Sequence, residues 1–109
     1  MSCIFCKIVN KEIPSTILWE NNDLLAIEDI NPVAPVHCLI IPKSHVTTVA
    51  EVDGNQLKSL PQCIEDLIIE KDLKKHGYRL VTNAGFDGGQ EVDHIHFHLL
   101  GGKKLGKMG

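Results

Sequence analysis

Three histidines alternate with apolar residues near the end of the chain, in the run His94-Ile95-His96-Phe97-His98-Leu99-Leu100. Successive side chains of an extended strand point to opposite faces, so this spacing predicts three imidazoles on one face and a buried apolar face behind them. Same-face side chains lie roughly 7 Å apart along a strand, which lets three imidazoles surround one phosphate or one metal ion. A neutral imidazole, with an ordinary pKa of about 6.5, is also a good nucleophile toward phosphorus. We therefore expect chemistry here, and the middle residue, His96, is the natural nucleophile.

A second set of reactive side chains lies at the other end of the chain. Cys3 and Cys6 form a C-x-x-C pair, and with two of the later histidines they match the ligand types of a tetrahedral Cys₂His₂ zinc site. A pair of thiols without a metal is the alternative, and the spacing alone leaves both open. Cys38 and Cys63 stand singly in apolar surroundings, so the four cysteines do not indicate the disulfide framework of a secreted protein.

A glycine-rich stretch, Asn83-Ala84-Gly85-Phe86-Asp87-Gly88-Gly89-Gln90, comes shortly before the histidine run. Such a stretch can present backbone N–H groups to a phosphate as an anion-binding loop. It can equally be a plain hairpin turn, since Asn and Gly are the usual turn residues. The composition alone does not choose between the two.

The rest of the chain supplies elements that could hold these residues. Apolar runs separated by turn residues predict short strands, and a longer run with apolar residues three or four positions apart predicts one principal helix. The helix begins with a capping-box pattern at Asp53 and Gln56, has a kink or a restart at Pro61, and ends at the sequence Lys-Lys-His-Gly. The strands are expected at 17–20, 24–28, 36–41, 78–82 and 92–100, and the helix at 53–76. This order predicts an α+β fold with an about five-stranded, mostly antiparallel sheet and one main helix.

The composition fits a single domain over residues 1–109, with a short tail at 101–109. Of the 109 residues, 43% are apolar and 23% are charged, and a core of this size would gain from a partner subunit or a metal. The formal net charge of −3 argues against nucleic-acid binding. Because no apolar run approaches the ~18 residues of a membrane span and no signal-peptide pattern is present, we expect a cytoplasmic protein with no membrane partner.

The histidine run resembles the signature of the histidine triad (HIT) family, and the resemblance extends over residues 3–102. The matching segments resemble the Hint branch of that family in order and spacing, and they are Cys-Ile-Phe-Cys-Lys-Ile, Lys-Glu-Ile-Pro, Ala-Ile-Glu-Asp-Ile-Asn-Pro, Ala-Pro-Val-His, Ile-Pro-Lys-Ser-His, Tyr-Arg-Leu-Val-Thr-Asn and Asp-Gly-Gly-Gln. The family comprises nucleotide-binding hydrolases and transferases. The resemblance implies a HIT-like fold with a short N-terminal helix besides the main one. It also implies cleavage of the phosphoramidate (P–N) or a related bond in purine nucleoside 5′-monophosphate conjugates.

The resemblance implies roles for individual residues as well. His96 would attack the α-phosphorus and form a nucleotidyl-histidine that water hydrolyses, while His98 would hold the phosphate and His37 would complete the cluster. Asp29 would bind the ribose hydroxyls, although capping of the following turn is a simpler role for the same side chain. The other implied substrate contacts are Asn83 and Gly89 beside the phosphate, Glu91 beside the leaving group, where some relatives have serine, and an apolar purine slot of Ile4, Phe5, Ile8, Ile13, Ile27 and Ile30.

Zinc-containing members of the family combine the cysteine pair with two histidines, which here are His45 and His94. The resemblance thus favours a structural zinc on Cys3, Cys6, His45 and His94 that the chemistry does not require, while two buried thiols stay the alternative. It leaves open whether His94 serves the metal or the phosphate. The expected partners are a purine nucleotide such as AMP, GMP or a phosphoramidate conjugate, and a second copy of the chain, joined through the main helix and an edge strand.

Two other functions are compatible with the same residues. The three histidines could ligate zinc directly, as three-histidine sites do, giving a zinc-dependent hydrolase or a metal-binding module. The chain could also be a nucleotide-binding regulatory protein with little turnover. Chelation separates the first from histidine catalysis, because only direct metal catalysis is lost with the metal.

Overall fold

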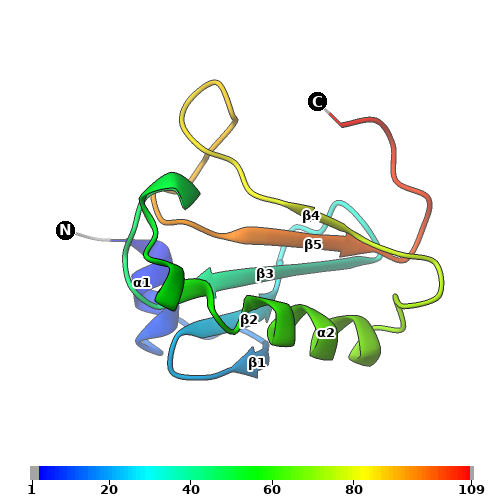
Figure 1. The fold of residues 1–109 in the computed structure, drawn as a ribbon, viewed down its shortest axis with the longest axis horizontal. Coiled ribbons are helices and arrows are strands. Elements are labelled where there is room, and N and C mark those ends of the chain that lie inside the picture. The colour runs from blue at the N-terminus through cyan, green and yellow to red at the C-terminus, as the bar shows by residue number, and fades with distance from the viewer. Residues whose placement is uncertain (1–2, 109) are drawn as a thin grey trace.

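The computed structural model describes residues 3–108, and Figure 1 shows one twisted sheet with helix α2 against it. All neighbouring strands are antiparallel, in the order β1-β2-β3-β5-β4. The strands are β1 (Ile17–Glu20), β2 (Leu24–Glu28), β3 (Val36–Pro42), β4 (Arg79–Val81) and β5 (Phe97–Gly101), and the helices are α1 (Ile4–Val9), α2 (Leu60–Glu70) and the 3₁₀ turns η1 (Val49–Glu51) and η2 (Gly54–Leu57). The sheet, the main helix and the short N-terminal helix confirm the predicted α+β fold. Residues 1, 2 and 109, which belong to the expected domain and tail, lie outside the described residues.

The hairpin of β1 and β2 forms at the predicted residues, 17–20 and 24–28. Its turn is held by Asn21, whose Oδ1 accepts the backbone N–H groups of Asp23 and Leu24 at 2.9 and 2.8 Å. An asparagine side chain that stands in for a backbone acceptor is a common way to close such a turn. The hairpin places the buried residues of β2 in the sheet, and the chain returns to the surface at Glu28, just before Asp29.

The helical segment is shorter and more broken than the predicted 53–76. Asp53 and Gln56 do form a capping box, but it begins the 3₁₀ turn η2 rather than the main helix. Pro61 lies in the first turn of α2, where a missing N–H leaves no hydrogen bond unmade, so of the two alternatives at this residue the restart is confirmed and the kink is not.

The end of the helix is also earlier than predicted. The backbone of Asp72 takes a φ of 57°, in the left-handed region, just after the last turn of α2. This conformation stops a helix. The Lys-Lys-His-Gly sequence therefore lies beyond the helix instead of ending it.

The sheet has two different faces. Helix α2 covers one of them, where Cys63 and Leu67 pack against Cys38, Ile40 and Leu99. Helix α1 packs against the other through the apolar cluster of Phe5, Ile8, Leu25, Ile27, Leu39 and Ile41. Side chains alternate along β3, so His37 shares the α1 face with Leu39 and Ile41. His98 is paired with Leu39 across β5 and β3, which places it on the same face.

The strand expected at 92–100 is shorter, because β5 begins only at Phe97. The strand expected at 78–82 shrinks likewise to the residues of β4. Before β5 the backbone N–H of Ile95 donates to the carbonyl of Val46 at 2.7 Å, in a loop rather than in the sheet. The predicted division of side chains is nevertheless confirmed: Ile95, Phe97 and Leu99 belong to the core on the α2 face. His94 and His96 both contact Phe5 of α1, and His96 also contacts His98.

No helix within residues 3–108 combines the length and the apolar character needed to cross a membrane.

Candidate active site

A row of hydrogen-bonding groups crosses the α1 face of the sheet and ends at His98. The backbone N–H of Val33 donates to Nδ1 of His37 at 3.1 Å. This nitrogen must carry a lone pair, so the proton of neutral His37 is on Nε2, which lies 2.9 Å from Nδ1 of His98 and 3.3 Å from Oδ2 of Asp29. His37 therefore donates to His98, and the proton of His98 is left on its own Nε2. The row ends in an N–H donor of fixed tautomer.

His96 is held with the opposite tautomer. Its Nδ1 lies 2.8 Å from the main-chain oxygen of His94. A carbonyl oxygen only accepts, so Nδ1 carries the proton and Nε2 of the neutral ring carries the lone pair. The rings of His96 and His98 have centroids 5.1 Å apart, and the ring of Phe5 meets His96 edge-on at 4.9 Å. A nucleophilic nitrogen and an N–H donor thus lie side by side.

Burial keeps the neighbouring imidazoles neutral at pH 7. Loss of hydration, together with the nearby rings of His96 and His37, lowers the pKa of His98 to about 4. Burial also lowers the pKa of His37, against the opposing effect of the Asp29 carboxylate. The pKa of His94 is lowered by burial as well. Neutral imidazoles are what tautomer-specific hydrogen bonding and metal ligation both need.

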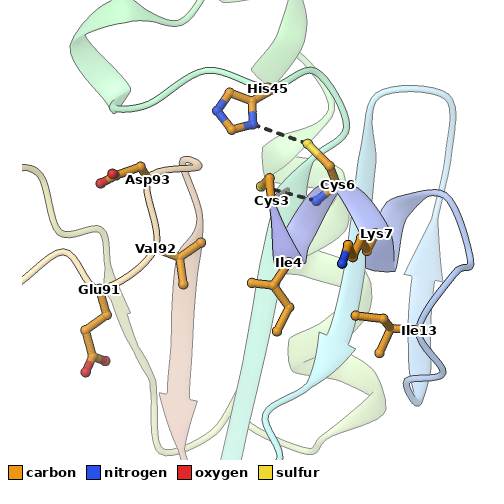
Figure 2. Close-up of a pocket in the computed structure, with 9 residues that line it drawn as sticks. All are labelled: Cys3, Ile4, Cys6, Lys7, Ile13, His45, Glu91, Val92 and Asp93. Atoms are coloured by element: carbon orange, nitrogen blue, oxygen red, sulfur yellow. Dashed lines mark hydrogen bonds between the residues drawn. The ribbon is translucent and has the colours of Figure 1, made fainter. Parts of the chain in front are cut away.

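Cys3 and Cys6 meet His45 and His94 at the start of α1. Figure 2 shows His45 reaching toward Cys6, whose Sγ lies 3.2 Å from Nδ1 of His45 and 3.6 Å from Nδ1 of His94. The Sγ of Cys3 lies 3.4 Å from the same nitrogen of His94, and the four ligand atoms are all within 4.8 Å of one another. A tetrahedral zinc ion with Zn–N and Zn–S bonds of about 2.0–2.3 Å holds its ligand atoms roughly 3.5 Å apart. The donor set and its spacing fit zinc.

His94 presents the correct nitrogen to this cluster. Its Nε2 lies 2.7 Å from the carbonyl oxygen of Pro42 and must donate to it, which leaves the lone pair on Nδ1 toward the two sulfur atoms. The ring of His94 is completely buried. It faces the cysteines rather than the phosphate side, and it contributes to the His96 site through its main-chain oxygen.

The geometry does not favour direct ligation of one metal by the three triad histidines. In the part of the chain that the structure describes, His94 groups with the two cysteines and His45, and His98 groups with Asp29 and His37, whereas His96 joins neither set. The second group is also a poor metal site, because Nε2 of His37 carries a proton when Nδ1 accepts from Val33.

The glycine-rich stretch forms a tight, self-bonded loop over residues 83–90. The side-chain Nδ2 of Asn83 donates to the carbonyl of Gly88 at 2.7 Å, and the backbone N–H of Gly89 donates to the carbonyl of Phe86 at 3.0 Å. The N–H of Gly89, expected to contact phosphate, is therefore used inside the loop. These bonds confirm the turn interpretation, and phosphate binding by the loop stays a prediction.

Asp29 lies at the end of β2 and divides its two oxygens between two partners. Oδ1 accepts the backbone N–H of Asn31 at 2.7 Å, which is the turn-capping role. Oδ2 faces His37. Asp29 also lines an open depression of about 470 Å³ together with Thr16 and Ile30.

The residues expected to form a purine slot do not form one surface. Phe5, Ile8 and Ile27 are buried in the cluster beneath α1. Ile30 is 89% exposed and stands on the rim beside Asp29. A base bound beside Ile30 would therefore contact Ile30 directly. Phe5, Ile8 and Ile27 are buried and offer such a base little surface.

Glu91 lines a larger open cavity of about 830 Å³ between α1 and segment 91–93. Figure 2 shows Glu91 and Val92 on one side of it and Ile4 and Lys7 on the other. Glu91 is exposed, so its carboxylate is accessible to a bound molecule.

Three residues that hold the site were not singled out from the sequence. Thr82 donates from Oγ1 to the main-chain oxygen of His96 at 2.9 Å. The side chain of Gln90 bonds to the backbone of Gly85, Thr47 and Val92. Both belong to segments that resemble the family, so that resemblance was the signal available for them. Val33 acts through its backbone N–H, which its residue type does not reveal.

Comparison with known proteins supports the resemblance. Residues 10–105 match the family model of the HIT domain. The purine nucleoside phosphoramidase of Escherichia coli K12 is 43% identical over 108 residues, which cover 96% of this chain and 91% of that protein. Among solved structures, a HIT family hydrolase from Clostridium thermocellum has a TM-score of 0.92 at 44% identity, covering 98% of this chain and 96% of its own. A histidine triad protein from Clostridium difficile has a TM-score of 0.90 at 43% identity, covering 100% and 97%.

The chain belongs to the HIT family, and its fold is the HIT fold.

Proposed function

We propose that this protein is a nucleotide hydrolase that cleaves the P–N bond of purine nucleoside 5′-phosphoramidates or related conjugates through a nucleotidyl-histidine at His96. The observation that carries the proposal is the pair of opposite tautomers, a free Nε2 on His96 beside an N–H donor on His98. The similarity to a protein named purine nucleoside phosphoramidase supports the substrate class.

The reaction proceeds in two displacements at phosphorus. The Nε2 lone pair of His96 attacks the α-phosphorus, the P–N bond breaks with its electron pair on the amine nitrogen, and the amine takes a proton from solvent. The Nε2–H of His98 donates to a phosphoryl oxygen, which gains negative charge during attack. Water then attacks the phosphorus, the bond to Nε2 breaks, and the nucleoside 5′-monophosphate leaves while the proton of the water passes to solvent.

In this mechanism the side chains stabilise the developing charges through fixed hydrogen bonds, and the protons of the amine and the water are exchanged with solvent. As positive charge develops on His96, its Nδ1–H bond to the His94 oxygen strengthens. The Asp29 carboxylate lies beside the Nε2 of His37, where it stabilises positive charge on the His37 and His98 pair. One Asp29 oxygen and the surface at Ile30 form the side on which the ribose and the purine of an AMP or GMP conjugate would bind.

A zinc ion on Cys3, Cys6, His45 and His94 is part of the proposal as a structural element. A site with four protein ligands has no open position for substrate, so zinc supplies cross-linking there and no Lewis-acid chemistry. It would tie α1 to His94, whose main-chain oxygen orients His96.

A homodimer also belongs to the proposal. Strand β4 is an edge strand of the sheet, and Leu80 on it, Tyr78 before it and Ile69 on α2 are exposed apolar side chains. Pairing two β4 edges would satisfy open backbone groups and join two sheets. Light scattering at micromolar concentration should give twice the chain mass, and a monomer there contradicts the dimer.

The function is tested by hydrolysis of adenosine 5′-phosphoramidate. Wild type should release AMP with and without a chelator, whereas His96→Gly should not. Loss of turnover on chelation alone would favour zinc catalysis, and tight AMP binding without turnover would favour a regulatory nucleotide-binding protein.

A further inference from the structure

The side chain of Gln90 is bonded at every polar position that an amide offers. Its Oε1 accepts the backbone N–H of Gly85 at 2.8 Å. Its Nε2 donates to the carbonyl oxygen of Thr47 at 2.7 Å and to that of Val92 at 3.0 Å. The amide has one acceptor oxygen and two N–H donors, so one side chain satisfies three backbone groups.

Two of these partners lie close to Gln90 in the chain, and the third, Thr47, is 43 residues away. Gly85 lies in the glycine-rich loop, Val92 lies in the segment that leads to the histidines, and Thr47 lies in the loop that follows His45. The neighbour of Thr47, Val46, accepts the N–H of Ile95 and so supports the backbone between His94 and His96. Segment 46–47 is thus a common support, to which Gln90 fastens the glycine-rich loop.

The other end of that loop is fastened to the nucleophile. Thr82, just before the loop, donates to the main-chain oxygen of His96. Within the loop, Asn83 is held by Gly88. Without the Gln90 side chain, this end of the loop would lose its bond to Thr47 and would be held by bonds within the loop, such as that from the Gln90 N–H to the Gly85 carbonyl at 3.1 Å. A displacement of the bound substrate by about 1 Å is enough to lower the reaction rate strongly.

We infer that Gln90 is a positioning residue that fixes the glycine-rich loop beside His96, so that the loop contributes to binding the phosphoryl group and not the nucleoside. The inference rests on the proposed function, since it assumes that a nucleotide phosphate lies at His96. Gln90 itself touches no substrate in this role.

The test compares AMP and adenosine, which differ only in the phosphate. Calorimetric titration of both ligands into wild type and Gln90→Met should show the AMP Kd about tenfold higher in the variant, as expected for the loss of the side-chain hydrogen bonds that hold the loop, with the adenosine Kd unchanged. Methionine has nearly the same length and no charge, so electrostatic repulsion of phosphate does not enter. Gln62→Met is the matched control, because Gln62 on the exposed surface of α2 bonds only to Asp66.

A second variant and a second measurement keep the test usable if Gln90→Met folds poorly. Gln90→Asn keeps the amide but is one methylene shorter, so it cannot span all three partners and should give a smaller rise in the AMP Kd. In hydrogen exchange, the Gly85 amide should exchange faster in both variants than in wild type.

Each outcome bears on the inference. Selective weakening of AMP supports it. Equal weakening of AMP and adenosine overturns it in favour of a general structural role, and no change in either Kd overturns it as well. If wild-type protein binds AMP no more tightly than adenosine, the proposed phosphate site at His96 is wrong. The inference, which depends on that site, is then wrong as well.

Discussion

His94 and His98 lie four residues apart, and burial lowers the pKa of both, but they have different partners. His94 donates from Nε2 to Pro42 and turns its Nδ1 lone pair toward two sulfur atoms. His98 accepts at Nδ1 from His37 and is left with an N–H on Nε2. The comparison teaches that the partner on one ring nitrogen decides what the other nitrogen can do, as a ligand or as a donor.

The two clusters also differ in which parts of the fold they join. The cysteine cluster joins α1, the loop after β3 and the segment before β5. The Asp29, His37 and His98 row runs across neighbouring strands of the sheet. Because the two clusters share no side chain, each should be removable while the other stays in place, and His96 depends on both.

The largest expected effect separates chemistry from metal binding. His96→Gly should lower kcat for adenosine 5′-phosphoramidate by at least about a thousandfold, because it removes the nucleophile. Its zinc content should stay equal to that of wild type, since the His96 ring is in neither ligand group. Metal analysis of protein purified without chelator checks this, and a parallel loss of zinc would show that the two clusters are not separable.

The next effect is on stability. His45→Ala should lose zinc and, for an ion present at about 100 to 1,000 times its Kd, lower the free energy of unfolding by about 3–4 kcal/mol. Turnover measured well below the unfolding temperature should fall by less than tenfold, because the nucleophile and its neighbour are still present. Thermal unfolding with and without chelator gives the first quantity and steady-state kinetics the second.

Cys38→Ala is the matched control for that experiment. Cys38 is a buried thiol on the α2 face, away from the cluster, and burial raises its pKa. Its removal should leave zinc content and the chelator response unchanged. A zinc loss equal to that of His45→Ala would mean that metal content follows stability rather than ligation.

A third effect follows from the lowered pKa of His98. The unfolded chain binds a proton at this residue below about pH 6.5, whereas the folded chain does so only below about pH 4, so the unfolded state holds more protons between these values. Stability therefore falls as the pH drops through this window, by about 1–2 kcal/mol after allowance for partial exposure. His98→Asn should lose this share of the pH dependence, and the exposed His76→Asn should keep it. Identical denaturation curves against pH for wild type and His98→Asn contradict the assignment.

The structure could be predicted from the sequence where neighbouring residues determine it. It could not be predicted where contacts between distant parts of the chain determine it. The hairpin at Asn21 and the strand at 36–41 were predictable because turn residues and short apolar runs act locally. The shorter β5 was not predictable, since the Val46 carbonyl that captures the N–H of Ile95 lies about fifty positions away in the chain.

The same reason limits what could be said of the site. The types of residues in both clusters were visible in the sequence, and the resemblance assigned their roles. The direction of His94 was open because it depends on Pro42, a carbonyl that no side-chain pattern reports. The early end of α2 at Asp72 likewise depends on a backbone conformation that the residue type permits without requiring.

The smallest expected effect tests how the backbone of the nucleophile is held. His96 has its Nδ1 held by the His94 oxygen and its own main-chain oxygen held by Thr82 at 2.9 Å. Thr82→Val removes that hydroxyl with little change in shape and should cost about 1 kcal/mol, or a five- to tenfold fall in kcat/KM. Thr48→Val is the control, because it removes a hydroxyl that donates to Glu51 at 3.2 Å, and it should leave kcat/KM unchanged. If Thr82→Val keeps full activity, the bond between Nδ1 of His96 and the main-chain oxygen of His94 is enough by itself to orient the nucleophile.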